Sequence, residues 1–251
     1  MTLLHEDRGQ AESRVCYDID GSRWGPLPGG GGSWSVLRRS ADRKALSAMV
    51  RLDSGFLTTI QIHAEDLPTI GYVLEGVLEF GGKRCGRGAM VALRPGAGDG
   101  VDSIAVGSRD GATVVVIRRP DRGGCPGLVD HSETVLVATP EDMPVVESVV
   151  AGKKTGITRR VMWVDSTGGG DIRELAVPPG FVGAGRGHHP CGEEILCLDG
   201  AITADEEHEL TRGWYLYNPA QYVHGGHEFS ERGAVLLEWH DAAWDLVLEP
   251  G

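Results

Sequence analysis

Histidines and a glutamate gather in one stretch of the C-terminal half of the sequence. His188 and His189 are adjacent, Glu193 follows four residues after the second of them, and His224 comes after a further turn-rich stretch. Imidazoles and a carboxylate are ligands that divalent transition metals accept, and two imidazoles with one carboxylate can occupy one face of an ion and leave positions open. These four residues are therefore the predicted metal ligands, and we predict no catalytic residue beyond them.

Strand geometry sets His188 apart from the other three. Successive side chains of a strand point to opposite faces, so in a regular strand His188 points away from Glu193. Gly187 can adopt positive φ and permit a bulge that turns His188 inward. We favour the bulged form, which supplies a third imidazole, over the regular strand, which leaves His189, Glu193 and His224 alone.

The other polar residues near these motifs are weaker candidates. In the competing interpretation, His189 and Glu193 form a surface ion pair and His224 lies in an ordinary loop. Glu194 should face away from Glu193 as an exposed acid. Three further residues are more readily structural or inert than ligating: Cys191, His227 and His240.

These ligands must be carried by short strands. The 38 glycines and 13 prolines cut the chain into short segments, as expected where many strands are joined by tight turns. Segments that are short, apolar and rich in β-branched residues or leucine are predicted strands: 46–52, 57–62, 71–80, 113–117, 159–164 and 235–239. The sequence therefore predicts an all-β protein.

An internal repeat divides the chain in two. Residues 54–76 align with residues 179–200 with a single one-residue gap, which indicates two homologous units. The first copy lacks the ligand set, because Glu65, Thr69 and Gly100 stand where the second copy has His189, Glu193 and His224. His63 of the first copy matches Gly187 of the second. We expect the first unit to be free of metal, as a scaffold or dimerisation partner, with His63 and Glu65 at a solvated strand end.

The repeat leads to a division into four segments. We predict a lead-in over residues 1–34, a degenerate barrel over 35–120, a connection over 121–156 and a metal-binding barrel over 157–251.

The C-terminal segment resembles the cupin superfamily. Its motif spacing is matched by two sets of residues: His189, Glu193 and Gly200, then Gly213, Pro219 and His224. The wording of these motifs resembles the ChrR-like branch over about residues 157–241, although the family's first histidine falls at Gly187. The resemblance implies two tandem cupin barrels, also called double-stranded β-helices or jelly rolls, and hence a bicupin with one divalent metal per chain. Iron(II) is favoured, with zinc, manganese, nickel or copper as alternatives.

Two classes of function follow from the resemblance. ChrR-like cupins include dioxygenases that act on diketones and hydroxyaryl ketones, and related cupins cyclise polyketides, so a metal-dependent oxygenase with a small oxygenated substrate is expected. The alternatives are a non-redox cyclase or isomerase, or a metal or ligand sensor without turnover. The residues before the first barrel show no helical period, which ranks the sensor below the enzyme.

Aromatic residues near the motifs are candidates for substrate contact. Half of any set carried by a strand faces inward, and the candidates are Tyr215, Tyr217, Tyr222 and Trp239.

Composition limits the partners and the compartment. The net charge of −12 and the pI near 5.2 disfavour nucleic acid and anionic membranes as partners. We expect no signal peptide, because the first residues lack a basic start followed by an apolar stretch. The five scattered cysteines fit free thiols in a reducing cytoplasm. A homodimer that binds a small-molecule substrate is expected.

Overall fold

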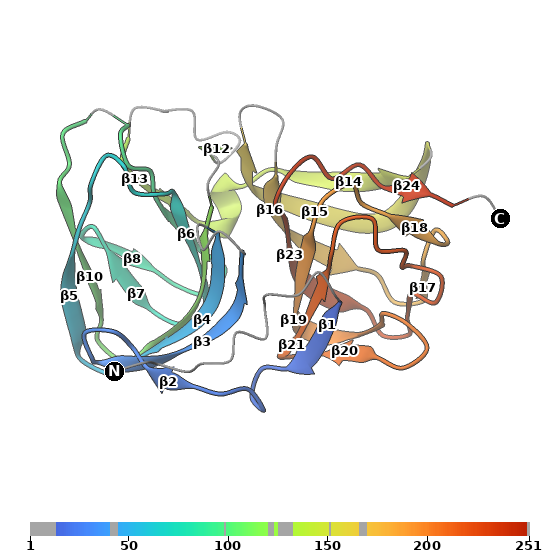
Figure 1. Cartoon of the computed structure of the whole chain (residues 1–251), viewed down its shortest axis with the longest axis horizontal. Helices are drawn as coiled ribbons and strands as arrows, with labels where there is room; N and C mark the ends of the chain where they lie inside the picture. Colours follow the sequence, from blue (N-terminus) through green and yellow to red (C-terminus); the bar gives the residue numbers. More distant parts are fainter. Residues whose placement is uncertain are drawn as a thin grey trace. The chain divides into compact units, whose positions relative to one another are not determined.

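A computed structural model describes most of the chain. The described ranges are 14–40, 45–97, 99–119, 123–124, 133–150, 152–165 and 170–249. Within them the regular structure is β-strand apart from one 3-10 helix, η1 (Pro140–Asp142) (Figure 1). The all-β prediction is therefore confirmed. None of the helical structure in these ranges is long and apolar enough to cross a membrane.

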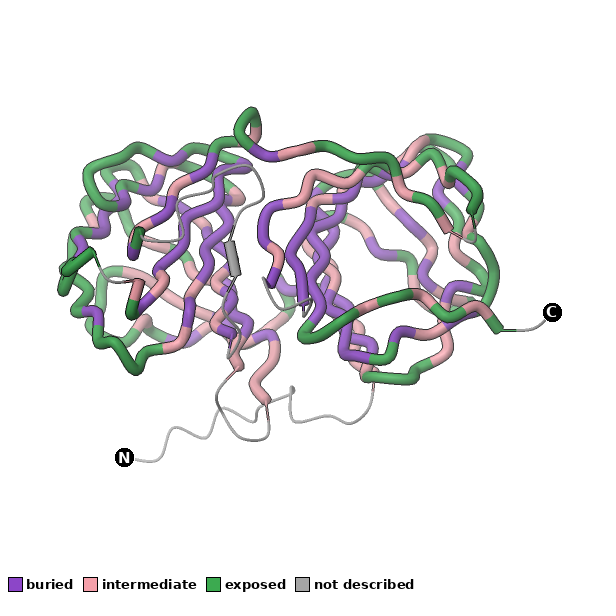
Figure 2. The backbone as a smooth tube through the Cα atoms, turned by 90° about the horizontal axis from the view of Figure 1, so that it is seen from above, coloured by how far each residue is buried: buried purple, intermediate pink, exposed green. Residues whose placement is uncertain are grey.

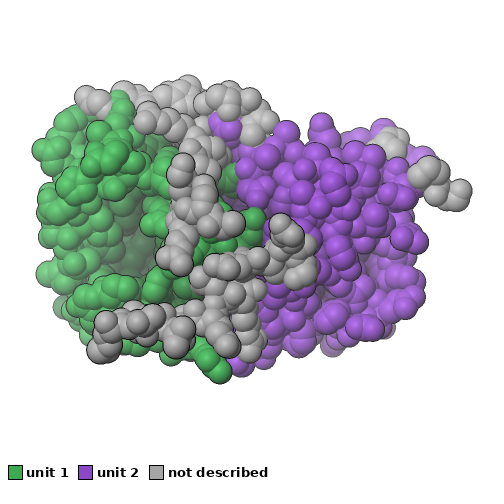
Figure 3. Space-filling model, in the orientation of Figure 1, with its two compact units in different colours: residues 1–10, 23–122, 128–142 green, residues 11–22, 123–127, 143–251 purple. Residues whose placement is uncertain are grey.

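The chain folds into two compact units that exchange short segments (Figure 3). Unit 1 comprises residues 1–10, 23–122 and 128–142, and unit 2 comprises residues 11–22, 123–127 and 143–251. Both the predicted lead-in and the predicted connection are thus shared between the units. β1 (Val15–Asp18) pairs with a strand of unit 2, whereas β13 (Val135–Ala138) pairs with a strand of unit 1.

Unit 1 contains two antiparallel sheets. Its remaining strands are β2 (Gly25–Pro26), β3 (Gly32–Arg39), β4 (Leu46–Leu52), β5 (Phe56–Gln61), β6 (Thr69–Gly76), β7 (Leu78–Phe80), β8 (Lys83–Cys85), β9 (Met90–Leu93), β10 (Ser103–Ser108) and β11 (Ala112–Arg118). One sheet has the order β13-β9-β6-β11-β4-β3-β2, and the other has the order β5-β10-β7-β8. Val73, Phe80, Val91 and Val114 belong to the apolar core.

Unit 2 is built mainly from one larger sheet. Its remaining strands are β12 (Gly123–Gly124), β14 (Val145–Val150), β15 (Lys153–Asp165), β16 (Asp171–Val177), β17 (Phe181–Val182), β18 (Gly187–His188), β19 (Glu193–Thr203), β20 (Glu209–Thr211), β21 (Trp214–Asn218), β22 (Phe229–Ser230), β23 (Ala234–His240) and β24 (Val247–Leu248). The main path is β1-β21-β19-β23-β16-β15-β12, and β18 pairs with β24 apart from it. Leu175, Leu216 and Leu236 belong to its apolar core.

Alternating burial along the strands explains why these segments form sheets. Figure 2 shows buried stretches along the strands of both units. In β11 three of the four buried residues are β-branched, which suits a pleated surface packed on a core. The predicted strand 71–80 is two strands, β6 and β7, because Gly76 adopts a φ of 75° and turns the chain.

The two units repeat the same pairing of two antiparallel strands, with a glycine at the same position in each. A Cβ added at Gly76 would lie 2.2 Å from the carbonyl oxygen of Gly111, and one added at Gly200 would lie 2.2 Å from that of Gly233. β6 pairs with β11 from this point, and β19 pairs with β23 in the same way. Counting along the paired strands from these two glycines gives residue equivalences between the units. Thr69, which is paired with Arg118, is equivalent to Glu193, which is paired with His240.

Candidate metal centre

Glu193 is the centre of a buried polar cluster in unit 2. It begins β19 and lies between Asn218 of β21 and His240 of β23 in the sheet. Directly opposed residues on neighbouring strands project from the same face. The Asn218 Nδ2 atom donates a hydrogen bond of 2.8 Å to Glu193 Oε2. The carboxylate is therefore held in place inside the unit.

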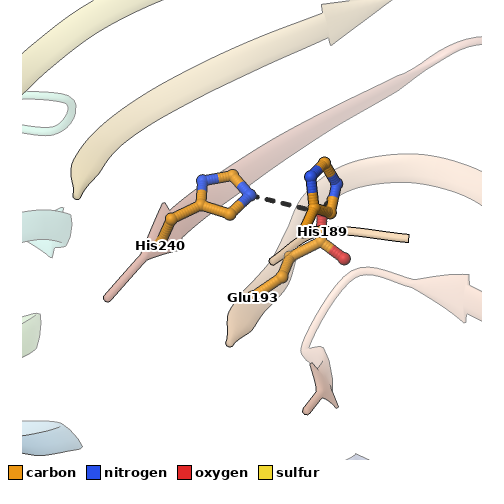
Figure 4. A group of neighbouring side chains, drawn as sticks. All are labelled: His189, Glu193 and His240. Atoms are coloured by element: carbon orange, nitrogen blue, oxygen red, sulfur yellow. Dashed lines mark ion pairs between the residues drawn. The ribbon is translucent and has the colours of Figure 1, made fainter. Parts of the chain in front are cut away.

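Three imidazoles surround this carboxylate. His189 Nε2 lies 3.3 Å from Glu193 Oε1, and His240 Nε2 lies 3.6 Å from the same oxygen. His224 Nε2 lies 3.1 Å from the other oxygen, Oε2. Ligand atoms of His189, Glu193 and His240 all lie within 4.8 Å of one another, and Figure 4 shows both rings close to the carboxylate. Side chains from β19, β23 and two loops thus converge at one point.

Each imidazole uses its other ring nitrogen, Nδ1, to contact an oxygen away from Glu193. His189 Nδ1 contacts the carbonyl oxygen of Trp244, and His224 Nδ1 lies 3.1 Å from the carbonyl oxygen of Gly187. His240 Nδ1 lies 2.8 Å from Asp171 Oδ1. A backbone carbonyl only accepts, so in the neutral form of His189 and of His224 the proton sits on Nδ1 and the Nε2 lone pair is available. This is the orientation that metal-ligating histidines take.

The charges of the cluster are mutually dependent. Burial raises the pKa of Glu193, but the interactions with His189, His240 and His224 outweigh it and hold that pKa well below its usual range. Burial lowers the pKa of His224, whereas for His189 the interaction with Glu193 overcomes burial and raises the pKa. For His240 the hydrogen bond to Asp171 and the interaction with Glu193 overcome burial and raise the pKa to about 9.

Arg173 lies next to the cluster and holds two of its carboxylates in position. Its Nε donates a hydrogen bond of 2.9 Å to Glu238 Oε1, and its Nη1 lies 3.4 Å from Asp171 Oδ2. The Arg173 guanidinium also lies 3.8 Å from the centre of the Trp244 ring. The arginine fixes the positions of Glu238 and Asp171, and Asp171 in turn orients His240.

The donor set fits a divalent cation. Three buried carboxylates, Glu193, Glu238 and Asp171, face one buried arginine, so the cluster carries more negative than positive charge when its histidines are neutral. The His240 Nε2 atom is buried and has no hydrogen-bond partner among the described residues, which is costly unless a further group binds there. A metal ion that accepts nitrogen and oxygen ligands would satisfy both conditions.

A cavity of about 150 Å³ adjoins the cluster. Its lining includes His189, Glu193 and His224, as well as Arg14, Phe181 and Glu228. A second, more polar hollow of about 400 Å³ shares Arg14 and His224 with it. Burial raises the pKa of Glu228 to about 7, and the nearby charge of Glu193 adds to this effect. The site therefore holds a group that can exchange protons near neutral pH.

Comparison with known proteins agrees with this geometry. Residues 134–242 match the model of the ChrR Cupin-like domain. The fold is similar to that of a provisionally assigned dioxygenase from Nostoc punctiforme, with a TM-score of 0.70, 15% identity, and coverage of 95% of this chain and 87% of that chain. Residues 134–242 therefore contain a ChrR Cupin-like domain, and the whole chain shares the fold of that solved structure.

Two other solved structures share this fold. Protein YlbA from E. coli has a TM-score of 0.67 and 13% identity, with 95% of each chain covered. A variant of oxalate decarboxylase from Bacillus subtilis has a TM-score of 0.58 and 14% identity, with 96% of this chain and 81% of that chain covered. The search of curated proteins found no match.

The structure does not bring His188 to the candidate metal centre. Its Nδ1 lies 3.5 Å from Glu249 Oε1, because β18 pairs with β24 as a regular strand. Gly187 does not adopt positive φ, so the predicted bulge is absent. A Cβ at residue 187 would lie 2.8 Å from the carbonyl oxygen of Val247 and 2.9 Å from Leu246 Cδ1. The C-terminal segment therefore packs closely against Gly187, the position at which the sequence resemblance expects the family's first histidine.

Three of the four predicted substrate contacts lie on the other face of the sheet. Asn218 and Leu216 of β21 line the cavity, so the alternating residues Tyr215 and Tyr217 face away from it. Trp239 also faces away from the cavity, because its neighbours Glu238 and His240 face the cluster.

Tyr222 alone lies near the mouth of the site. It lines the polar hollow, and its ring is 5.4 Å from the Arg14 guanidinium.

The remaining weaker candidates are outside the cluster. Glu194 faces away as expected, but it is buried rather than exposed, and it accepts a hydrogen bond of 2.6 Å from the Tyr215 hydroxyl. His227 pairs with the exposed Glu206. Burial raises the pKa of Cys191 to about 11, which keeps the thiol protonated. In unit 1, His63, Glu65 and Gly100 are exposed.

Sequence reasoning undervalued His240 and missed Asp171 and Glu228. The alternation of Glu238, Trp239 and His240 places the two charged residues on one face, but the sequence does not reveal that this face meets Glu193. That contact depends on the register between β19 and β23.

Proposed function

We propose that unit 2 binds one divalent metal ion through His189, Glu193, His224 and His240, and that the protein is a metal-dependent oxygenase acting on a small oxygenated organic substrate. The observation that carries the proposal is the convergence of three imidazole Nε2 atoms on one buried carboxylate. His240 takes the place of the family's first histidine. Four ligands leave about two positions open on a six-coordinate ion.

A bound iron(II) ion would supply Lewis-acid polarisation of a substrate oxygen and redox chemistry with dioxygen. The protein supplies binding, orientation and proton exchange. Asp171 holds the His240 ring, and the Trp244 carbonyl holds the His189 ring. Phe181, Leu216 and Leu236 line the cavity with apolar surface that limits access of water.

Arg14 is the proposed substrate anchor. Its Nε donates a hydrogen bond of 3.0 Å to Asn218 Oδ1, and its Nη1 pairs with Asp205. The remaining Nη2 atom is buried and has no hydrogen-bond partner among the described residues. It can donate to a carbonyl or carboxylate oxygen of a substrate that occupies both the inner cavity and the polar hollow. Glu228 is the proposed proton carrier.

The test begins with protein purified without oxygen. Metal analysis and titration with iron(II) should give about one ion per chain in the wild type. Dioxygen uptake is then measured with 2,4-pentanedione, with a hydroxyacetophenone and with a 2-oxo acid. Substrate-dependent uptake in the wild type that is lost in His224→Ala and Arg14→Met would support the proposal.

Two results would contradict different parts of it. Failure to bind metal would overturn the metal centre itself. Metal-dependent conversion of a substrate without dioxygen would overturn the oxygenase assignment and leave the metal centre intact.

A further inference from the structure

Unit 1 contains a cavity of about 630 Å³, larger than the cavity beside the metal centre. Side chains from both sheets line it, including Thr58 and Ile60 of β5, Val91 of β9 and Val116 of β11. Its volume lies in the range of sites that hold drug-sized ligands.

The lining of this cavity carries no ionisable side chain among the described residues. The only polar side chains in it are Thr58 and Thr69. The Thr69 hydroxyl donates a hydrogen bond of 3.2 Å to the carbonyl oxygen of Leu67 and is therefore already satisfied. A charged ligand would lose its hydration in this cavity without gaining a partner.

The internal repeat shows that positions which carry polar residues of the candidate metal centre in unit 2 carry uncharged residues in unit 1. The β6 and β9 registers place Thr69 beside Leu93, as β19 and β21 place Glu193 beside Asn218. The carboxylate and the amide that holds it are thus replaced by a hydroxyl and an isobutyl group.

The buried ion pair behind the metal centre is replaced as well. Val116 opposes Ala48 in unit 1, where Glu238 opposes Arg173 in unit 2. Gly71 opposes the same valine, where unit 2 has Ile195. Smaller and uncharged side chains at matching positions explain both the larger volume and the absence of charge.

The cavity is open at β5. Leu57 is 75% exposed and Ile60 is 37% exposed, although both belong to the lining. Apolar side chains at the entrance of an apolar cavity favour the entry of a ligand that carries little polar surface.

We propose that unit 1 is a second binding site, which takes an uncharged apolar or aromatic small molecule and does not require metal. Transfer of apolar ligand surface from water to these side chains drives the binding. The proposal rests on unit 1 alone and does not depend on the activity proposed for unit 2.

The experiment uses N-phenyl-1-naphthylamine, a neutral aromatic probe, and the full chain. Binding is measured by equilibrium dialysis, so that changes in probe emission near a new indole cannot imitate a loss of binding. We expect saturable binding of about one probe per chain, equal in the presence and absence of EDTA. Thr58→Trp fills the cavity from an exposed strand position and should weaken binding by about tenfold or more, the loss expected when bulk occupies the ligand's space.

Thr59→Trp is the matched control, because Thr59 is the next residue of β5, is exposed and does not line the cavity. It should keep the affinity within about twofold of wild type. Circular dichroism establishes that both variants are folded. Absence of saturable binding, equal affinity in the two variants, or loss of binding in His224→Ala would each overturn the proposal.

Discussion

At the scale of single residues, some side chains of the candidate metal centre can be predicted from the sequence and others cannot. The motif spacing was enough to bring His189, Glu193 and His224 into one hypothesis, because two loops and one strand end carry them in a fixed order. Motif spacing does not predict that His240 belongs to the cluster, because its contact with Glu193 is made between two paired strands. His188 was misjudged because the C-terminal segment that holds it in a regular strand is distant in sequence.

A first prediction separates the two histidines. His240→Ala should lower metal affinity by at least about tenfold, as His224→Ala should, because each loses a ligand. His188→Ala should stay within about twofold of wild type, because its side chain contacts Glu249. Competition with a chromophoric chelator under nitrogen measures all three affinities. Equal losses in His188→Ala and His240→Ala would contradict the assignment.

Asp171 gives a graded form of the same test. Asp171→Asn keeps the shape but weakens the orientation of His240, so its affinity should fall between those of wild type and His240→Ala.

A second prediction concerns Glu228 in the metal-free protein. Its pKa is raised from 4.5 to about 7, so the folded state holds this proton more tightly than the unfolded state does. The stabilising effect of the proton is present at low pH and is lost as the pH rises toward 7. Thermal melting in EDTA should therefore show Glu228→Gln gaining stability relative to wild type between pH 4.5 and 7, then levelling.

Glu231→Gln, which removes an exposed acid from the same turn region, controls for the loss of one charge. A difference between Glu228→Gln and wild type that does not change with pH would contradict the prediction.

At the scale of strands, local pattern predicted most elements well. The prediction for 46–52 coincides with β4, and those for 113–117 and 235–239 fall inside β11 and β23. The substrate candidates failed at a different step. Alternation along β21 offers two faces, and the sequence does not say which one the core of unit 2 takes, so Tyr215 and Tyr217 were placed on the wrong one.

A third prediction concerns β18 and β24. Gly187→His restores the family's first histidine in sequence, but its Cβ would lie 2.8 Å from the Val247 carbonyl oxygen. Overpacking of this kind typically costs about 1–3 kcal/mol. We expect lower stability in urea unfolding and no gain in metal affinity. Tighter metal binding in this variant would show that the C-terminal segment gives way and that residue 187 remains available for ligation.

At the scale of the whole molecule, the two units share a scaffold and differ in what fills it. The repeat predicted two homologous units. The register of β6 with β11 in unit 1 matches that of β19 with β23 in unit 2. The exchange of segments was not predictable, because the local sequence of β1 or β13 does not specify which sheet edge it joins.

A fourth prediction uses the two sites together. A ligand that binds only the folded state raises the stability of the unit that holds it. In calorimetry, a divalent metal should raise the melting of unit 2, and N-phenyl-1-naphthylamine should raise that of unit 1. Protection of backbone amides from hydrogen exchange assigns each effect to its strands. Protection by the probe confined to β16, β19 and β23 would contradict the assignment of the apolar site to unit 1.

The placement of β1 also bears on how the protein is made. Residues 11–22 belong to unit 2, and Arg14 among them lines the cavity of the metal centre. During synthesis β1 leaves the ribosome about two hundred residues before β21, its partner strand. β1 therefore has no partner strand until β21 has been synthesised. A fragment that begins after unit 1 would therefore lack both an edge strand and an arginine of its own site, and dissection of the protein has to carry residues 11–22 along.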